Sequence, residues 1–177
     1  MLCFAYGSNL HIGQMAQRCP AAKPLGRIIL PDWKLIFRGV ADCVPEPGAV
    51  CYGGVWRITP DCERALDRYE GVQGGAYRKE YVPVTGDVEG EALIYVMNST
   101  GIFPPSADYL RVIQEGYRDF RMPQNAYRLL HEAVQAAWDN KAPSHIECRR
   151  YARKGRPRLA APPLRRPGHA GGRDEQV

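Results

Sequence analysis

The apolar pattern of this chain changes its period near residue 100, and that change constrains the fold more than any other feature. Apolar segments typical of strands occupy 2–6, 27–37, 50–58, 77–84 and 89–97. After them, Ser106 and Pro123 each precede a segment whose apolar residues recur every three or four positions, as on one face of a helix. Because strands come first and helices follow, we expect an α+β fold rather than repeating βα units.

Two shorter helices are expected among the strands. One covers 10–18, with Ser8 or Asn9 as its N-cap. The other begins at Thr59-Pro60, since threonine is a favoured N-cap and proline a favoured first helical residue. Gly71 is well placed to end this helix in a left-handed conformation. The helix opened by Pro123 should turn its apolar side to the core, and that side comprises Ala126, Leu129, Leu130, Ala133, Val134 and Trp138.

Glycine and proline mark where the strands turn. Pro31-Asp32 predicts a turn or bulge inside 27–37, because proline cannot donate a hydrogen bond to a sheet. Gly53-Gly54 predicts a bend inside 50–58. Thr85-Gly86-Asp87 predicts a hairpin that joins the last two strands.

The net charge of +5 is unevenly distributed over the 177 residues. From Arg149 to the end there are nine Lys/Arg and two Asp/Glu, whereas residues 1–148 hold fifteen and seventeen. We therefore expect one domain at 1–148 and a basic Arg/Pro/Gly-rich tail at 149–177 that is too poor in large apolar residues to fold. The tail could contact nucleic acid or an anionic surface, or it could act only as a solubilising extension.

The cysteines and the amino terminus bear on the compartment. No apolar run approaches the roughly 18 residues that span a bilayer, and the first residues read as a strand rather than a secretory signal. The six cysteines contain no Cys-x-x-Cys pair and no histidine at zinc spacing. We expect buried, unreactive thiols, no metal, no membrane contact and a cytoplasmic location.

The stretch Tyr6-Gly7-Ser8-Asn9 ends the first strand abruptly. Glycine permits a positive φ and lets a ligand approach the backbone without meeting a Cβ. The following N–H groups, at the start of a helix, could then face an anion or a developing oxyanion. The same four residues could equally form an ordinary strand-to-helix turn with a capped helix.

Glu70 is a second candidate, because it ends the helix that began at Pro60. A carboxylate is disfavoured at the negative end of a helix, so its pKa should rise. The glycines that follow (Gly71, Gly74 and Gly75) would let a loop close over a small ligand, or they could form a plain flexible linker. Judged locally, a solvated glutamate without any role is also compatible with this pattern.

Three segments together resemble the gamma-glutamylcyclotransferase superfamily. They are Phe4-Ala5-Tyr6-Gly7-Ser8-Asn9-Leu10, Glu70-Gly71-Val72-Gln73-Gly74-Gly75-Ala76-Tyr77 and Pro104-Pro105-Ser106-Ala107-Asp108-Tyr109. Their order and separations resemble those of the gamma-glutamyl amino acid cyclotransferases. The resemblance implies a small mixed β-barrel flanked by helices. It also implies that Glu70 is catalytic and that the substrate-binding residues are Tyr6, Gly7, Ser8, Asn9, Leu10, Tyr77 and Tyr109.

This sequence departs from the family pattern in two places. Arg121-Met122-Pro123 stands where Gly-Leu-Pro is expected, and the basic tail has no counterpart in the pattern. The glutathione-specific branch typically carries leucine after Tyr-Gly-Ser, whereas Asn9 stands here, so that branch fits less well.

The implied reaction converts a gamma-glutamyl amino acid or amine to 5-oxoproline and a free amine, without metal or redox cofactor, in a monomer or homodimer. A second hypothesis is a non-catalytic module of the same fold that holds a small ligand, with the tail contacting nucleic acid. A third keeps the enzyme but has it remove a gamma-glutamyl protecting group from a biosynthetic intermediate. Glu70 discriminates between enzyme and module, because a module needs no carboxylate set against a helix dipole.

Overall fold

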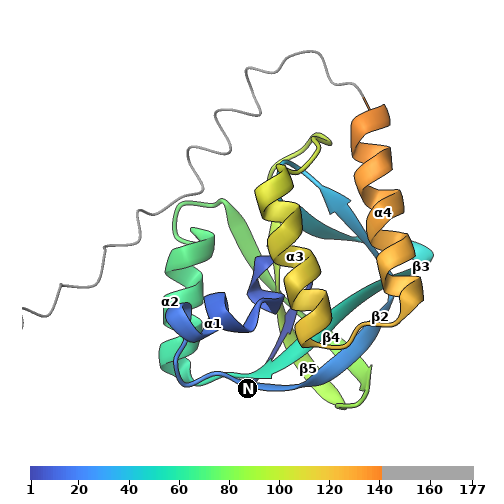
Figure 1. Ribbon diagram of the computed structural model, residues 1–177. Helices are drawn as coiled ribbons and strands as arrows, with labels where there is room; N and C mark the ends of the chain where they lie inside the picture. The colour runs from blue at the N-terminus through green and yellow to red at the C-terminus, as the bar shows by residue number, and fades with distance from the viewer. Residues whose placement is uncertain (141–177) are drawn as a thin grey trace, which may run out of the picture.

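The computed structural model describes residues 1–140, which form a closed five-stranded barrel with helices packed around it (Figure 1). The strands are β1 (Leu2–Ala5), β2 (Lys23–Phe37), β3 (Ala41–Arg57), β4 (Tyr77–Gly86) and β5 (Gly90–Met97). Around the barrel they follow the order β1, β3, β2, β4, β5, and β5 pairs again with β1. The β1–β5 pair is parallel and the other pairs are antiparallel, so the predicted mixed barrel is confirmed.

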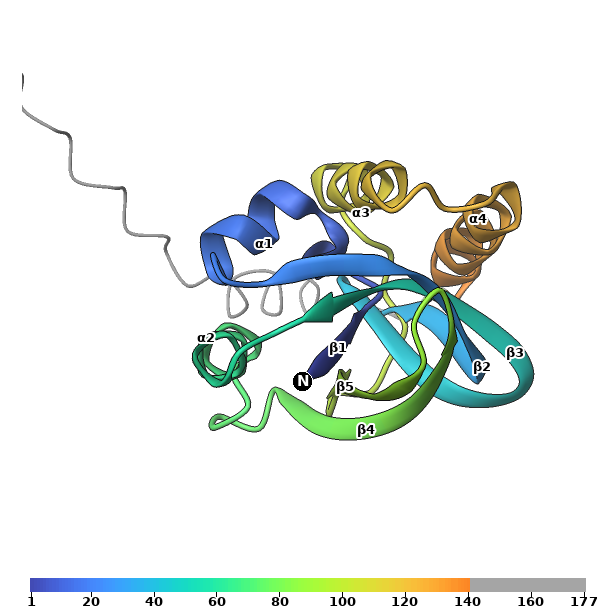
Figure 2. The ribbon, with the colours of Figure 1, turned by 90° about the horizontal axis from the view of Figure 1, so that it is seen from below.

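The helices of the described residues flank the barrel. They are the 3-10 helix η1 (Ser8–Leu10) and the α-helices α1 (Ile12–Arg18), α2 (Pro60–Glu70), α3 (Ala107–Asp119) and α4 (Gln124–Asp139). In Figure 2, α1, α3 and α4 lie on one side of the barrel, and α2 lies beside the end where β4 begins. Within residues 1–140, no helix combines the length and the apolar character needed to cross a bilayer.

The seams of the barrel differ in length. β2 and β3 pair along nearly their whole lengths, and β4 pairs with β5 from Tyr77 to Val84. By contrast, β2 meets β4 only at Ile28 with Gly86 and at Ile29 with Thr85. The register of β2 and β3 shifts between Pro31 and Trp33, where Asp32 has a φ of 59°, and this confirms the predicted bulge.

Helix α2 begins and ends at the residues that the sequence predicted. The Thr59 hydroxyl accepts a hydrogen bond from the N–H of Cys62 at 3.2 Å, and Pro60 occupies the first helical position. Gly71 ends the helix with a φ of 68° and a ψ of 36°, a left-handed conformation that glycine adopts without a Cβ penalty. Cys62 and Leu66 bury one face, which fixes Glu70 at the helix end beside the barrel.

Two predicted helix details were wrong. The N-cap of α1 is His11, whose Nδ1 accepts from the N–H of Gln14 at 3.1 Å, because Ser8–Leu10 first closes a separate 3-10 turn. In α4 the side chain of Trp138 is 58% exposed, and the buried positions are Ala126, Leu130, Ala133 and Ala137. A helix turns by about 100° per residue, so a four-residue spacing ending at Ala137 leaves its neighbour Trp138 facing solvent.

The predicted strand 50–58 is longer than expected and does not bulge at its glycines. β3 begins at Ala41, and its pairing with β2 stays in register through Gly53 and Gly54. A Cβ at Gly53 would overlap the ring of Phe4, and one at Gly54 would overlap the ring of Phe120. These glycines therefore admit aromatic rings against the strand.

The core contains the described cysteines. Cys3, Cys19, Cys43, Cys51 and Cys62 are all buried and free, as predicted, and Cys148 lies outside the described residues. The predicted boundary near residue 148 and the predicted disordered tail also lie outside the described residues. The cytoplasmic location stays a prediction.

Candidate active site

The loop Tyr6–Leu10 leaves β1 and folds into the 3-10 turn. The N–H of Leu10 donates to the carbonyl of Gly7 at 3.0 Å, whereas the N–H groups of Gly7 and Asn9 donate to no acceptor within residues 1–140. Gly7 has a φ of −116°, so the left-handed conformation considered from the sequence is not the reason for glycine here. A Cβ on Gly7 would come within 3.1 Å of the Tyr109 hydroxyl, so the missing side chain makes room for that group.

Glu70 meets this loop directly. Its Oε1 accepts a hydrogen bond from Nδ2 of Asn9 at 2.8 Å, which joins residues 61 positions apart in the chain. Glu70 keeps a small exposed fraction, but the surrounding protein displaces most of its water, and this burial raises the pKa of the carboxyl group to about 7. The Asn9 hydrogen bond and the positive charge of Arg18 oppose the rise, so burial outweighs both.

Three predicted tyrosines converge on the same place from different elements. The Tyr6 hydroxyl donates to the carbonyl of Tyr95 at 2.5 Å, and the Tyr109 hydroxyl accepts from the N–H of Ala41 at 3.1 Å. Burial raises the pKa of Tyr6, Tyr77 and Tyr109 above the ordinary tyrosine value, and the negative charge of Glu70 raises each further. These phenols therefore surround the carboxylate as neutral groups.

Ser8 and Leu10 take different places. The Ser8 hydroxyl accepts from the guanidinium of Arg18 at 3.2 Å and stays with the site. Leu10 is fully buried, and its Cβ lies where a side chain on Gly116 of α3 would sit. The Leu10 side chain is therefore part of the core, which leaves its backbone as the part that could face a ligand.

Comparison with known proteins identifies the family. The model of the family described as "Gamma-glutamyl cyclotransferase, AIG2-like" matches residues 3–119, which is more than half of the chain. This chain belongs to the gamma-glutamyl cyclotransferase family. It is 30% identical over 161 residues to the gamma-glutamylcyclotransferase of Bos taurus and equally to that of Mus musculus, covering 82% of this chain and 85% of each relative.

Solved structures agree with that assignment. One described as gamma-glutamyl cyclotransferase superposes with a TM-score of 0.66 at 26% identity, covering 88% of this chain and 99% of that one. A crystal structure of an uncharacterized protein from Homo sapiens gives a TM-score of 0.69 at 29% identity, covering 73% of this chain and 85% of that one. The barrel described above is therefore the fold of gamma-glutamyl cyclotransferases.

Sequence reasoning missed Arg18, the last residue of α1. Its guanidinium contacts Ser8 and Asn9 of the loop and also lies 3.9 Å from the centre of the Tyr69 ring, next to Glu70 in α2. Nothing in the local sequence marks Arg18, because these contacts depend on how α1 folds back over the loop. In the sequence alone, a basic residue in the last turn of a short helix is explained by its favourable interaction with the helix dipole.

The departure at Arg121 from the family pattern has a backbone consequence. Arg121 has a φ of 50°, a left-handed conformation that glycine adopts freely and other residues adopt at a cost. The cyclotransferase pattern expects glycine at this position, and its backbone carbonyl accepts a hydrogen bond from the guanidinium of Arg27. The departure therefore affects the turn between α3 and α4 and its contact with Arg27 of β2.

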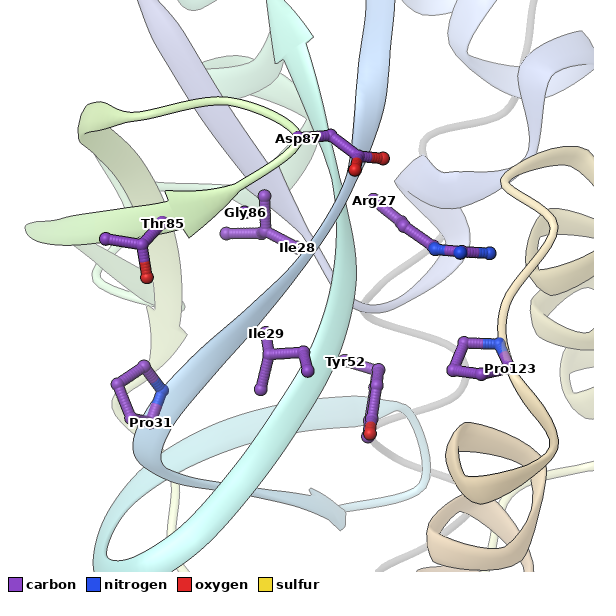
Figure 3. A pocket seen from close by; sticks show the side chains of 9 residues that line it. All are labelled: Arg27, Ile28, Ile29, Pro31, Tyr52, Thr85, Gly86, Asp87 and Pro123. Atoms are coloured by element: carbon purple, nitrogen blue, oxygen red, sulfur yellow. The ribbon is translucent and has the colours of Figure 1, made fainter.

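A shallow hollow of about 440 Å³ lies at a different place, where β2 meets β4 near the start of α4 (Figure 3). Its lining is Arg27, Ile28, Ile29, Pro31, Tyr52, Thr85, Gly86, Asp87 and Pro123, and none of these is a predicted site residue. The residues around Glu70 are those that share hydrogen bonds and shifted pKa values. We therefore place the candidate active site at Glu70 and not at the hollow.

Among residues 1–140, no group of three or more His, Cys, Asp or Glu side chains is arranged to hold a metal ion. The histidine nearest the loop, His11, caps α1 and approaches Glu115 at 3.1 Å.

Proposed function

We propose that this chain converts a gamma-glutamyl amino acid or gamma-glutamyl amine to 5-oxoproline and the free amine, with Glu70 as general base and then general acid. The observation that carries the proposal is a carboxyl group with a pKa near 7 that is hydrogen-bonded to the loop Tyr6–Leu10. A catalytic group with a pKa near the working pH is both a competent base and a competent acid. The family membership supports the same chemistry.

The proposed reaction needs only proton transfers and one exchange of acyl bonds. Glu70 takes a proton from the α-ammonium group of the substrate, and the nitrogen then attacks the γ-carbonyl carbon to close a five-membered ring. Glu70 then gives its proton to the departing nitrogen, the oxyanion collapses, and the bond from carbon to that nitrogen breaks. The ring nitrogen gives up its second proton, which passes through Glu70 to the released amine, so 5-oxoproline forms as a neutral lactam and the amine leaves as an ammonium ion. Each proton removed is returned, so no redox cofactor takes part.

The loop and the tyrosines would supply orientation. The N–H groups of Gly7 and Asn9 have no acceptor among the described residues, so they are available to an oxyanion. Neutral Tyr77 and Tyr109 would hold the flexible glutamyl chain in the folded conformation that ring closure needs. The entropy lost in reaching that conformation is a large part of the barrier in such reactions.

The test is 5-oxoproline release from gamma-glutamyl amino acids, gamma-glutamylamines and glutathione, measured with wild-type protein and Glu70→Gln. Release from at least one substrate that is lost in Glu70→Gln supports the proposal and begins to name the leaving group. Release that persists in Glu70→Gln removes Glu70 from the mechanism. A folded wild-type protein that binds these compounds without turnover would instead support the binding module.

A further inference from the structure

Arg18 makes a set of contacts that constrains the chemistry at Glu70. One terminal nitrogen donates to Asn9 Oδ1 at 2.5 Å and to Ser8 Oγ at 3.2 Å. The other donates to Gln14 Oε1 at 2.5 Å and to the Tyr69 hydroxyl oxygen at 2.6 Å. A guanidinium has donors and no acceptor, so each of these four groups must present an oxygen lone pair to it.

This requirement fixes the orientation of the Asn9 amide. Because Oδ1 faces Arg18, the amino group Nδ2 faces Glu70 and donates to Oε1 at 2.8 Å. The reversed amide would set a donor against the guanidinium and an acceptor against the carboxylate, which loses both bonds. The chain of contacts from Arg18 through Asn9 to Glu70 thus has one direction.

The same direction separates the two oxygens of Glu70. Oε1 is occupied as an acceptor, so a proton on the carboxyl group belongs on Oε2, which has no hydrogen-bond partner among residues 1–140. Ser8 is constrained similarly, since its oxygen accepts from Arg18 and its own proton remains available to another group.

We propose that Arg18 is a positioning residue that, through Asn9, makes Oε2 the proton-carrying oxygen of Glu70 and keeps Ser8 a donor towards the substrate. This inference rests on the proposed function. Arg18 would touch neither the substrate nor the reacting atoms. It would set which atoms of Glu70 and Ser8 the substrate meets.

The electrostatics of the site support this role. Around Glu70, the titratable neighbours Cys3 and Tyr6 (β1 and the loop), Tyr77 (β4), Tyr95 (β5) and Tyr109 (α3) are kept neutral, because burial raises the pKa of each. The carboxylates Asp42 and Asp67, whose charges act on these same neighbours, are bonded to Arg38 and Lys79. Among residues 1–140, Arg18 is the one charged side chain whose field lowers the pKa of Glu70.

The first test measures the Glu70 carboxyl directly, by ¹³C NMR titration of glutamate-labelled protein with the signal assigned from Glu70→Gln. Arg18→Met removes both the positive charge and the hydrogen bonds of the guanidinium group, so it should raise the pKa of Glu70 by about half a unit or more. The matched control is Arg64→Met, which removes the same charge from an exposed arginine paired with Asp61 on α2. An Arg18→Met protein that titrates like wild type overturns the proposal.

Two further variants separate positioning from charge. Arg18→Lys keeps the charge but cannot make the forked contacts, so it should shift the pKa of Glu70 less than Arg18→Met while lowering kcat about tenfold or more. Asn9→Leu removes the hydrogen-bond relay from Arg18 through Asn9 to Glu70. In a protein that already carries Asn9→Leu, Arg18→Met should therefore raise the pKa of Glu70 by less than it does in the wild-type protein. Full additivity, or an Arg18→Lys enzyme with wild-type kcat, would overturn the relay.

The two proposals fail separately. If wild-type protein releases no 5-oxoproline, the proposed function is wrong, and the NMR titration still decides whether Arg18 controls Glu70. If wild-type protein turns over its substrate but the pKa of Glu70 in Arg18→Met equals the wild-type value, only the inference about Arg18 is wrong.

Discussion

Two carboxylates are largely withdrawn from water in this protein, Asp42 in β3 of the barrel and Glu70 at the end of α2 beside it, and their hydrogen bonding differs. Asp42, at the start of β3, has no exposed surface; its Oδ2 accepts from Nε of Arg38 at 2.7 Å, and its Oδ1 accepts from the N–H groups of Cys43 at 2.9 Å and Met97 at 3.0 Å. Glu70 accepts one hydrogen bond from the described residues, on one of its two oxygens. Burial is common to both, but only Glu70 keeps an unoccupied oxygen.

Hydrogen-bond saturation, rather than burial, therefore distinguishes the structural carboxylate Asp42 from Glu70, the carboxylate proposed to react. Asp42 joins the end of β5 to the start of β3 and to the turn that carries Arg38, so its oxygens hold strands together. Glu70 retains a raised pKa because its single amide partner does not offset the loss of water. Glu70 can therefore gain or lose a proton without disturbing the hydrogen bonds that hold the strands of the barrel together.

The largest expected effect is on turnover in Glu70→Gln. The amide keeps the shape and can still accept from Asn9, but it cannot take up a proton, so kcat should fall by about 10² to 10⁴-fold. Initial rates of 5-oxoproline release measure the loss, and circular dichroism shows whether the fold is intact. A kcat within tenfold of wild type in a folded Glu70→Gln would mean that Glu70, like Asp42, has no part in the reaction.

Asp42→Asn should act on stability. Either orientation of the new amide sets an N–H donor against Arg38 or against the backbone N–H groups, and the arginine loses its buried partner. We expect a loss of about 3–5 kcal/mol in the free energy of unfolding, measured by urea denaturation at neutral pH. A loss below about 1 kcal/mol would mean that Asp42 is not the strand tie that its contacts indicate.

Glu70→Gln should also change how stability depends on pH. The folded pKa of about 7 lies above the ordinary value of 4.5, so the folded protein holds this proton more tightly than the unfolded chain. Its stabilisation is complete below about pH 4.5 and is lost as pH rises through about 7, a change of about 3 kcal/mol. The variant lacks this loss, so its stability relative to wild type should rise between pH 4 and pH 8, as parallel urea titrations would reveal. Parallel curves for the two proteins would contradict the raised pKa.

The smallest effect is expected from Arg38→Lys. Lysine keeps a positive charge near Asp42, but it cannot also make the bond that Arg38 donates to the carbonyl of Gly101 at 2.7 Å. The expected cost is about 1 kcal/mol in the free energy of unfolding, with 5-oxoproline release unchanged. A change in turnover larger than the change in stability would place Arg38 nearer to the chemistry than this comparison does.

Where structure was set by neighbouring residues, the sequence predicted it well. Helix α2 is one case, because Thr59, Pro60 and Gly71 act within one turn of the helix ends. The first part of β3 is the opposite case: Pro45, Pro47 and Gly48 argue against a strand, yet residues 41–45 pair with β2 and the pairing resumes at Val50. Prolines are tolerated there because that stretch of β3 has β2 on one side and lacks a paired strand on the other among the described residues.

The site divides in the same way. The helix-end position of Glu70 was legible from its neighbours, and so was the abrupt end of β1 at Tyr6. The bond between Asn9 and Glu70 spans 61 positions, and the contacts of Arg18 depend on the packing of α1 against α2. Such contacts follow from the closed fold and from no local pattern, which is why Arg18 was overlooked.

The short seam between β2 and β4 has a dynamic consequence. Closure there depends on the residue pairs at Ile28 and Ile29, and the β1–β5 seam likewise has two pairs, whereas β2 with β3 and β4 with β5 pair along most of their lengths. Local opening begins where few backbone bonds must break, so amide protons bordering this seam should exchange with solvent before those shared by β2 and β3. Tyr77 lies at the opposite end of β4 from the seam. Local opening of the β2–β4 seam should therefore leave Tyr77 and Glu70 in place.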